Sequence, residues 1–378
     1  MRCIGQSQIS LSRMSLEVNG STDEVGWQER RGEAVLFEDE QVEIIRQRDR
    51  SLMTSQDRRK RSPPLGRGHT PVLLREMLAA LDVRSGGAYL DATFGAGGYA
   101  RAILQAGAGR VFAIDRDAAA VARGRELAAA CPRFTMLEGR FGEMAGLLGA
   151  QGVRQLDGIV LDLGVSSIQL DDPDRGFSFA VDGPLDMRMS STGTTAAEVV
   201  NRADAATLAD ILRWYGEEPA ARRIARAIIE RRQRRPIERS HELAQLVADV
   251  VGGRPGRTHP ATRTFQALRI HVNDELRELE RALPAAEALL ALGGRLVVVA
   301  FHSLEDRMVK RFLAERSDAR ARPSRHLPLP VVSATAPRWR LLVKRAVRPQ
   351  PAEIAANPRA RSARLRWAER AAAPEPAP

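Results

Sequence analysis

The stretch that decides the fold reads Asp91-Ala92-Thr93-Phe94-Gly95-Ala96-Gly97-Gly98-Tyr99. Its first three residues end an apolar segment, residues 88–93, that predicts a strand. The glycines that follow precede a predicted helix at residues 100–105. Glycines at such a turn let the backbone approach a ligand closely, and the first amides of the helix then point at that ligand. Their spacing does not match the G-x-G-x-x-G pattern of dinucleotide-binding loops. We therefore predict a ligand-binding turn of another kind, with a purely structural turn as the alternative.

Strand and helix patterns alternate along the chain beyond this turn. A helix is predicted at residues 118–130, and further strands are predicted at residues 111–114, 134–137 and 158–163. Ahead of the turn, Thr70 is expected to cap a helix that has Pro71 in its first position. The apolar face of this helix would consist of Leu73, Met77 and Leu81. This order predicts an α/β fold with a Rossmann-like, doubly wound parallel sheet.

The alternation stops after Gln169. Residues 171–269 show helical periodicity and few strand patterns, which predicts an inserted all-helical domain. The sheet is expected to resume with a helix at 285–292, which ends at Gly293-Gly294, and with strands at 295–301, 339–344 and 362–367. We therefore assign residues 66–170 and 270–370 to the sheet domain and residues 171–269 to the insert. Residues 1–65 and 371–378 lack this patterning and are predicted to be disordered extensions.

Composition limits the functional classes. With 378 residues and 44% hydrophobic side chains, the chain can bury a sizeable core. Two cysteines, Cys3 and Cys131, cannot form a disulfide framework and suit a reducing compartment. No segment predicts a membrane span or a signal peptide, so we expect a cytoplasmic protein. The net charge of +11 is concentrated in residues 318–378, which hold 13 basic and 4 acidic side chains. This excess suits contact with nucleic-acid phosphates, and a solvated basic tail is the alternative.

Acidic residues follow two of the predicted strands. Asp115 closes the second strand, where a carboxylate can accept both hydroxyls of a ribose, and Asp162 ends the fourth strand at the same edge of the sheet. Asp117 is predicted to cap the next helix. Phe141, just after the third strand, either lies against an adenine ring or belongs to the core. The glycine turn together with Asp115 resembles the S-adenosylmethionine loop of Rossmann-like methyltransferases.

Longer motifs carry a closer resemblance. They are Gly68-His69-Thr70-Pro71-Val72-Leu73-Leu74, Asp162-Leu163-Gly164-Val165-Ser166-Ser167, Gln169-Leu170-Asp171-Asp172, Arg175-Gly176-Phe177-Ser178-Phe179, Gly183-Pro184-Leu185-Asp186-Met187-Arg188-Met189, His259-Pro260-Ala261-Thr262-Arg263-Thr264-Phe265-Gln266-Ala267, Phe301-His302-Ser303-Leu304-Glu305-Asp306-Arg307 and Asn357-Pro358-Arg359-Ala360-Arg361-Ser362. In this order they resemble the bacterial ribosomal RNA small subunit methyltransferase H family, also called MraW. The resemblance covers residues 66–370.

The resemblance implies methyl transfer from S-adenosylmethionine to the N4 amine of a cytidine in the decoding region of 16S ribosomal RNA. The implied partner is 16S ribosomal RNA or the small ribosomal subunit. Carried over by motif, the cofactor contacts would be Gly97, Gly98, Tyr99, Asp115, Phe141, Asp162 and Gln169. The family often has His where this chain has Tyr99, a position expected to act mainly through its backbone.

Cysteine placement favours transfer to an exocyclic nitrogen. Methylation at cytosine C5 requires a thiolate in the active site, and neither Cys3 nor Cys131 is suitably placed. Transfer to an amine requires alignment and an acceptor for its hydrogens. Asp162 is the first candidate for orienting the amine, and His302 is the second. The alternatives are that Asp162 contacts only the cofactor and that His302 has a structural hydrogen-bonding role.

The predicted insert offers a surface for RNA. Seven arginines crowd one predicted helix, namely Arg222, Arg223, Arg226, Arg231, Arg232, Arg234 and Arg235, with a solvated helical face as the alternative. Four side chains between the sheet and the insert could receive a splayed base by stacking and phosphate contact, namely Arg175, Phe177, Phe179 and Arg188. The alternative is that they belong to an ordered loop. Apolar residues recur at helical spacing over residues 261–283 and predict core. No Cys/His cluster has metal-ligand spacing, so we expect no metal.

Two other functions remain compatible with the sequence. The chain would then be a methyltransferase that acts on a protein or a small molecule, or an RNA-binding ribosome assembly factor that keeps a cofactor pocket without turnover.

Overall fold

A computed structural model describes residues 71–252, 259–317 and 337–371. The extension predicted at residues 1–65 and all but the first residue of the predicted tail lie outside the described residues. Within the described part, no helix has both the length and the apolar character needed to cross a lipid bilayer.

The centre of the fold is a seven-stranded sheet in the order β3-β2-β1-β4-β5-β7-β6. Five strands are parallel, namely β1 (Ala88–Asp91), β2 (Arg110–Asp115), β3 (Phe134–Glu138), β4 (Leu156–Asp162) and β5 (Leu290–Ala300). β7 (Arg364–Arg370) runs antiparallel to β5, and β6 (Trp339–Leu341) pairs with β7 at the sheet edge. The predicted α/β class with a doubly wound sheet is confirmed. Its topological switch lies between β1 and β4.

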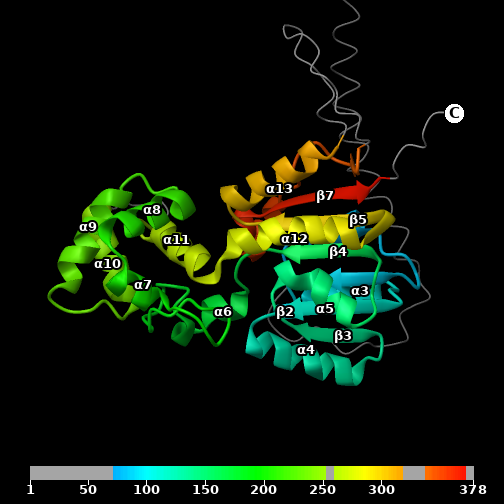
Figure 1. Ribbon diagram of the computed structural model, residues 1–378, viewed down its shortest axis with the longest axis horizontal. Coiled ribbons are helices and arrows are strands. Elements are labelled where there is room, and N and C mark those ends of the chain that lie inside the picture. The colour runs from blue at the N-terminus through cyan, green and yellow to red at the C-terminus, as the bar shows by residue number, and fades with distance from the viewer. Residues whose placement is uncertain (1–70, 253–258, 318–336, 372–378) are drawn as a thin grey trace, which may run out of the picture. The chain divides into compact units, whose positions relative to one another are not determined.

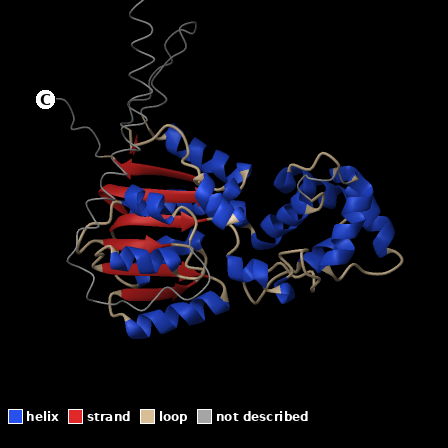
Figure 2. Cartoon of the chain, turned by 180° about the vertical axis from the view of Figure 1, so that it is seen from behind, coloured by secondary structure: helices blue, strands red, loops and turns tan. Residues whose placement is uncertain are grey.

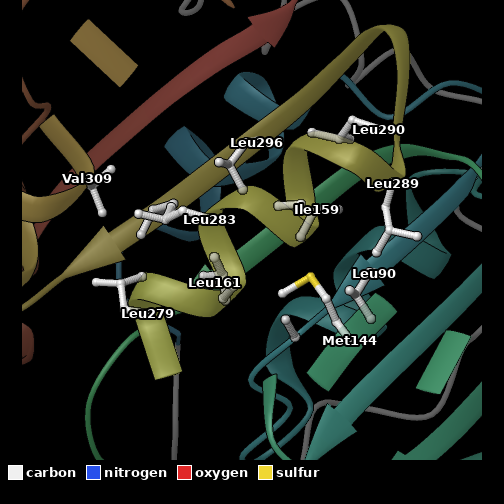
Figure 3. Packing of buried hydrophobic residues seen from close by; sticks show 14 of the residues in the cluster. Leu90, Met144, Ile159, Leu161, Leu279, Leu283, Leu289, Leu290, Leu296 and Val309 are labelled. Carbon is white, nitrogen blue, oxygen red and sulfur yellow. The ribbon is translucent and has the colours of Figure 1, made fainter. Parts of the chain in front are cut away.

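Helices cover both faces of the sheet, as Figures 1 and 2 show from opposite sides. They are α2 (Leu74–Leu81), α3 (Gly98–Gln105), α4 (Ala118–Ala130), α5 (Met144–Ala150), α12 (Glu275–Leu289) and α13 (Ser303–Glu315). On one face, Leu279 and Leu283 of α12 pack over Ile159 and Leu161 of β4 (Figure 3). Because side chains alternate across a strand, the other face takes the intervening apolar residues. Two covered faces explain the nearly continuous apolar strands.

A second hydrophobic cluster is formed by residues between Phe177 and Leu268. The helices that contribute to this cluster or pack against it are α6 (Ser167–Asp171), α7 (Ala196–Arg202), α8 (Ala205–Gly216), α9 (Ala221–Arg232), α10 (Ser240–Val251) and α11 (Thr262–Asn273). Near the C-terminus, α14 (Pro351–Ala356) is followed by a short 3₁₀ helix, η4 (Pro358–Ser362). The predicted limits of the insert, residues 171 and 269, stay a prediction.

Three local expectations were wrong. The first helix begins at Leu74, because Leu73 adopts a left-handed φ of 52° and donates its amide to Glu353 Oε1 at 2.7 Å. α12 ends at Leu289, since Leu290 already pairs with Leu156 of β4. Finally, α9 ends at Arg232, so Arg234 and Arg235 lie beyond the arginine-rich helix.

Trp339 anchors the edge of the sheet. It is 1% exposed, its ring meets Phe312 edge-on, and its Nε1 donates to Glu287 Oε2 at 2.8 Å. We expect Trp339→Ala to lower the free energy of unfolding by about 3–5 kcal/mol, because the cavity it leaves cannot close fully. Denaturant titration measures this loss. The matched control is Trp214→Ala, since Trp214 is 63% exposed; equal losses for both variants would contradict the assignment.

Candidate active site

The glycine turn between β1 and α3 is held by Asp91. Its carboxylate accepts from the amides of Thr93 at 3.3 Å and Ala100 at 3.1 Å. Burial raises the pKa of Asp91 to about 7. Gly97, the N-cap of α3, has a φ of 78° and no side chain to cap the helix, and the Asp91 carboxylate takes the Ala100 amide instead. A Cβ on Gly98 would lie 2.1 Å from Pro71 Cγ. The turn therefore requires these glycines, and it leaves the amides of Gly98 and Tyr99 without a side-chain acceptor among the described residues.

Tyr99, predicted as a cofactor contact, has a buried ring, and its hydroxyl donates to the carbonyl of Val72. The side chain thus ties α3 to the segment before α2. Only the backbone of Tyr99 is left for a ligand, in line with the expectation that this position acts through its main chain.

Asp115 ends β2 beside the turn. Its Oδ2 accepts from the Gly95 amide at 2.7 Å, and its Oδ1 accepts from the Asp117 amide at 2.9 Å. Burial raises its pKa. A carboxylate has about four acceptor positions, so two remain after these bonds. Asp115 therefore both orders the turn and keeps the capacity to accept two hydroxyls of a ribose.

Gln169 and Arg175 meet at Asp117. Asp117 caps α4 as predicted, and its Oδ2 accepts from Gln169 Nε2 at 2.8 Å and lies 2.8 Å from Arg175 Nη1. The other polar atom of Gln169, Oε1, accepts from the Ser166 amide. Both polar groups of Gln169 are thus engaged within the protein. Gln169 fixes the loop after β4 against the start of α4.

Phe141 begins a 3₁₀ helix, η1 (Phe141–Glu143), directly after β3. Its ring is half-buried and packs on the cluster beneath α12. The next amide, that of Gly142, donates to Glu278 Oε2 at 3.1 Å. The backbone there is anchored to α12, and Phe141 stands at the same sheet edge as Asp115.

Asp162 ends β4 and is the most unusual group at this edge. Its amide donates to Thr93 Oγ1 at 2.6 Å, which joins β4 to the glycine turn. Its Oδ1 is buried and has no hydrogen-bond partner within the described part of the chain. Burial, reinforced by the charges of Asp91 and Glu305, raises its pKa to about 8. An unpaired buried carboxylate is costly, and it is typical of a site that a ligand completes.

His302 is the N-cap of α13. Its Nδ1 accepts from the Glu305 amide at 3.5 Å, and its Nε2 lies 3.0 Å from Glu305 Oε1. Burial raises the pKa of Glu305, but His302 and Arg269 outweigh it, so the net shift is downward. Both ring nitrogens of His302 face Glu305. This arrangement favours the alternative of a structural hydrogen-bonding role for His302 over a role in orienting the acceptor amine.

Among the described residues, His302 and Glu305 also form a group with Glu275 whose ligand atoms lie within 4.8 Å of one another, as a metal site would require. Arg269 occupies Glu275, with Nε at 2.8 Å and Nη2 at 2.9 Å. Because a guanidinium already balances these carboxylates, we assign no metal to them.

The loop that was expected to receive a base is internally bonded. Arg175 donates to the carbonyls of Arg188 and Met189. Arg188 binds Asp186 through Nε at 2.8 Å and Nη2 at 2.6 Å. Phe177 is 6% exposed, and the ring of Phe179 packs on His259 and Phe265. These contacts favour the ordered-loop alternative.

Sequence reasoning missed two features. Arg116, which follows β2, donates to the Asn273 carbonyl at 2.9 Å. The Asn273 side chain bonds to the backbone of Met187 and Met189. These contacts join the end of β2 to the segment that contains Met187 and Met189. Trp214 is 63% exposed on α8, with the Arg213 guanidinium 5.3 Å from its ring centroid. A tryptophan outside the apolar stripe of a helix was the available signal for the second feature.

Comparisons with known proteins agree with this arrangement. The model of the MraW methylase family matches residues 66–371. The chain is 60% identical over 307 residues to a protein of Paramagnetospirillum magneticum named "Ribosomal RNA small subunit methyltransferase H", covering 81% of this chain and 96% of that one. A protein of the same name from Rhodospirillum centenum is 61% identical over 307 residues, with 81% and 93% covered.

Among solved structures, the chain is similar to a SAM-dependent O-methyltransferase from Thermotoga maritima. The TM-score is 0.35, the identity is 12%, and 83% of this chain and 74% of that one are covered. The family model and the two relatives carry the assignment, and the chain belongs to the MraW methylase family.

Proposed function

We propose that this protein transfers a methyl group from S-adenosylmethionine to the N4 amine of a cytidine in the decoding region of 16S ribosomal RNA. As a member of the MraW methylase family, it is an S-adenosylmethionine-dependent methyltransferase. Its relatives are named for ribosomal RNA of the small subunit. The observation that carries the assignment of the site is the unpaired, buried Oδ1 of Asp162 beside the glycine turn. A ribosomal substrate also implies action in the cytoplasm.

The residues present fit the cofactor. The two free acceptor positions of Asp115 suit the ribose hydroxyls. The backbone of Gly97, Gly98 and Tyr99 offers a close approach, and Phe141 stands where an adenine could lie against it. Gln169 supports this site indirectly, through its hydrogen bond to Asp117. When bound, the cofactor supplies an electrophilic methyl group on a positively charged sulfonium.

Asp162 is the group that serves the acceptor amine. In its ionised form, Oδ1 can accept a hydrogen bond from an exocyclic amine, orient its lone pair and take up its proton. No covalent intermediate is required. Cys131, the free cysteine of the described residues, ends α4, whereas Asp117 at the other end of that helix marks the active-site edge. The thiol is therefore not available to attack a base at this site.

The insert, predicted as residues 171–269, is the proposed substrate-recognition domain. Arg222, Arg223 and Arg226 are exposed on α9, while Ile224 and Ile228 of the same helix are buried. In contrast, Arg232 is turned inward and donates to the carbonyls of Val200 and Ala203. The exposed arginines give this helix a basic face suited to phosphates.

Methyl transfer in vitro tests this function. Protein is mixed with S-adenosylmethionine carrying a labelled methyl group and with small ribosomal subunits from cells that lack the gene. We expect label in 16S RNA, and none with Asp162→Ala. Label in ribosomal protein or in a small amine would favour another substrate class. Tight RNA binding without any incorporation would favour an assembly factor.

The pKa of Asp162 predicts a difference between the cofactor and its demethylated product, S-adenosylhomocysteine. A sulfonium close to the carboxylate favours the ionised form, and the product lacks that charge. In the protein without a ligand, the pKa of Asp162 is about 8. Binding of the cofactor at a pH below this value should therefore release a proton from Asp162, whereas binding of the product should not. The affinity for the cofactor relative to the product should therefore increase as the pH rises and level off above this pKa.

Calorimetry at neutral pH, in buffers of different ionisation enthalpy, measures this proton release. The variant Asp162→Asn should abolish the difference between the two ligands. Equal proton release by cofactor and product with the unaltered protein would contradict the placement of Asp162 beside the sulfonium.

A further inference from the structure

A basic pocket lies beside the proposed active site. Its volume is about 390 Å³. Phe301, His302 and Ser303, which follow β5, line it together with the end of α8, the start of α11 and the end of η4. It therefore forms where the sheet, the insert and the C-terminal segment meet.

Two observations show that the pocket is close to Asp162. β4 and β5 are paired, and Asp162 lies opposite Val299, two residues before Phe301. In addition, a Cβ built on Gly164 would lie 4.0 Å from Phe301 Cδ2. The loop after Asp162 thus borders a residue of the pocket wall. A substrate group held in the pocket would be next to the acceptor site.

Charge defines what the pocket can bind. Four arginines and one glutamate line it: Arg263, Arg348, Arg361, Arg364 and Glu217. Two of these charges are already balanced, because Arg364 binds Asp306 at 2.8 Å and Glu217 binds Arg307 at 2.6 Å. Within residues 71–252, 259–317 and 337–371, the other three arginines have no carboxylate partner. Arg263 is near enough to Glu217 to help lower the pKa of that carboxyl, so the excess positive charge of the pocket rests mainly on Arg348 and Arg361.

These three arginines come from separate parts of the chain. Arg263 is on α11, Arg348 precedes α14, and Arg361 is on η4. All three side chains are exposed, so they keep their hydration, but their mutual repulsion still opposes the arrangement. The planar guanidinium is suited to bidentate contact with phosphate. The Ser362 hydroxyl also lines the pocket, whereas the Ser303 hydroxyl already donates to Glu217 Oε2.

We propose that this pocket binds one phosphodiester group of the ribosomal RNA, next to the nucleotide that is methylated. This proposal rests on the proposed function. It adds that the pocket positions the backbone of the RNA substrate. Phosphate contacts set the register of a protein on a nucleic acid without reading its sequence. Here such a contact would place the target base over Asp162.

The test compares Arg348→Gln, Arg361→Gln and the double variant with Arg154→Gln. Arg154 is also exposed, but it precedes β4 and so lies at the opposite edge of the sheet. The KM for small ribosomal subunits from cells that lack the gene is measured at several KCl concentrations. The dissociation constant of S-adenosylhomocysteine is measured by calorimetry.

Each pocket substitution is expected to raise this KM about tenfold, since a charge-assisted hydrogen bond is lost. The double variant should also reduce the slope of log KM against log salt by about 0.7, the loss of one phosphate contact to a single strand. The affinity for S-adenosylhomocysteine should stay unchanged. Arg154→Gln should match the unaltered protein in all of these measurements.

An unchanged KM and salt slope in the double variant would overturn the proposal, while labelling of RNA by the unaltered protein would leave the proposed function intact. Weaker binding of S-adenosylhomocysteine without an effect on KM would also overturn it, because the pocket would then hold the carboxylate of the cofactor. If the unaltered protein labels no RNA, the proposed function fails and this proposal fails with it.

Discussion

Replacing Asp162 by asparagine is expected to lower the rate of methyl transfer about a thousandfold, within the range known for positioned proton acceptors. Asparagine keeps the shape of the side chain but removes its charge and its ability to take up a proton. Among the described residues, the Oδ1 of Asp162 is the buried carboxylate oxygen at this edge that has no hydrogen-bond partner. Single-turnover measurements at saturating cofactor and substrate separate this loss from binding.

Asp157→Asn is the matched control for this prediction. Asp157 lies on the same strand near its other end, where its Oδ2 accepts from the Ala88 amide at 2.8 Å. An asparagine oxygen can keep that hydrogen bond, so the rate should stay close to that of the unaltered protein. A rate for Asp162→Asn within tenfold of the unaltered protein would show that Asp162 contacts only the cofactor.

Replacing Asp115 by alanine should weaken the binding of both S-adenosylmethionine and S-adenosylhomocysteine by at least about a hundredfold. Each hydrogen bond from a ribose hydroxyl to a carboxylate contributes about 1.5–3 kcal/mol, and both ligands carry the same ribose. The substitution also removes the acceptor for the Gly95 and Asp117 amides, so the glycine turn loses its support. Calorimetry measures both dissociation constants.

An analogue of S-adenosylhomocysteine without ribose hydroxyls isolates the direct contact. The unaltered protein should bind this analogue weakly, and Asp115→Ala should weaken its binding much less than that of the natural ligand. Equal losses for the two ligands would mean that Asp115 acts only by ordering the turn.

Local patterns predicted the elements that local interactions determine. The helix at residues 118–130 was correct at both ends, because Asp117 caps it and accepts from the Ala119 amide at 2.9 Å. The apolar strands were placed to within a few residues, since burial on both faces makes them stand out. The doubly wound order then placed Asp115, Phe141 and Asp162 at one edge.

Contacts between distant residues explain the errors. Nothing near Leu73 in the sequence indicates that the Glu353 carboxylate binds its amide and shifts the start of α2. Likewise, Leu290 belongs to a strand because Leu156 pairs with it, although its neighbours favour a helix. Tertiary pairing overrides local propensity in both places.

The same limit applies to the site. The sequence identified Gln169 as a candidate, but its bond to Asp117 depends on the loop after β4 lying against α4. The basic pocket combines arginines from three segments, so no single motif contains it. Burial of the Asp162 oxygen likewise depends on Asp91, Thr93 and Glu305 surrounding the end of β4.

If this protein makes N4-methylated cytidine in 16S ribosomal RNA, the presence of that nucleoside depends on its gene. The most direct measurement is nucleoside mass spectrometry of 16S RNA from cells with the gene, from cells without it and from cells in which it has been restored. We predict that N4-methylated cytidine disappears with the gene and returns when the gene is restored. An unchanged amount of this nucleoside in cells without the gene would contradict the claim.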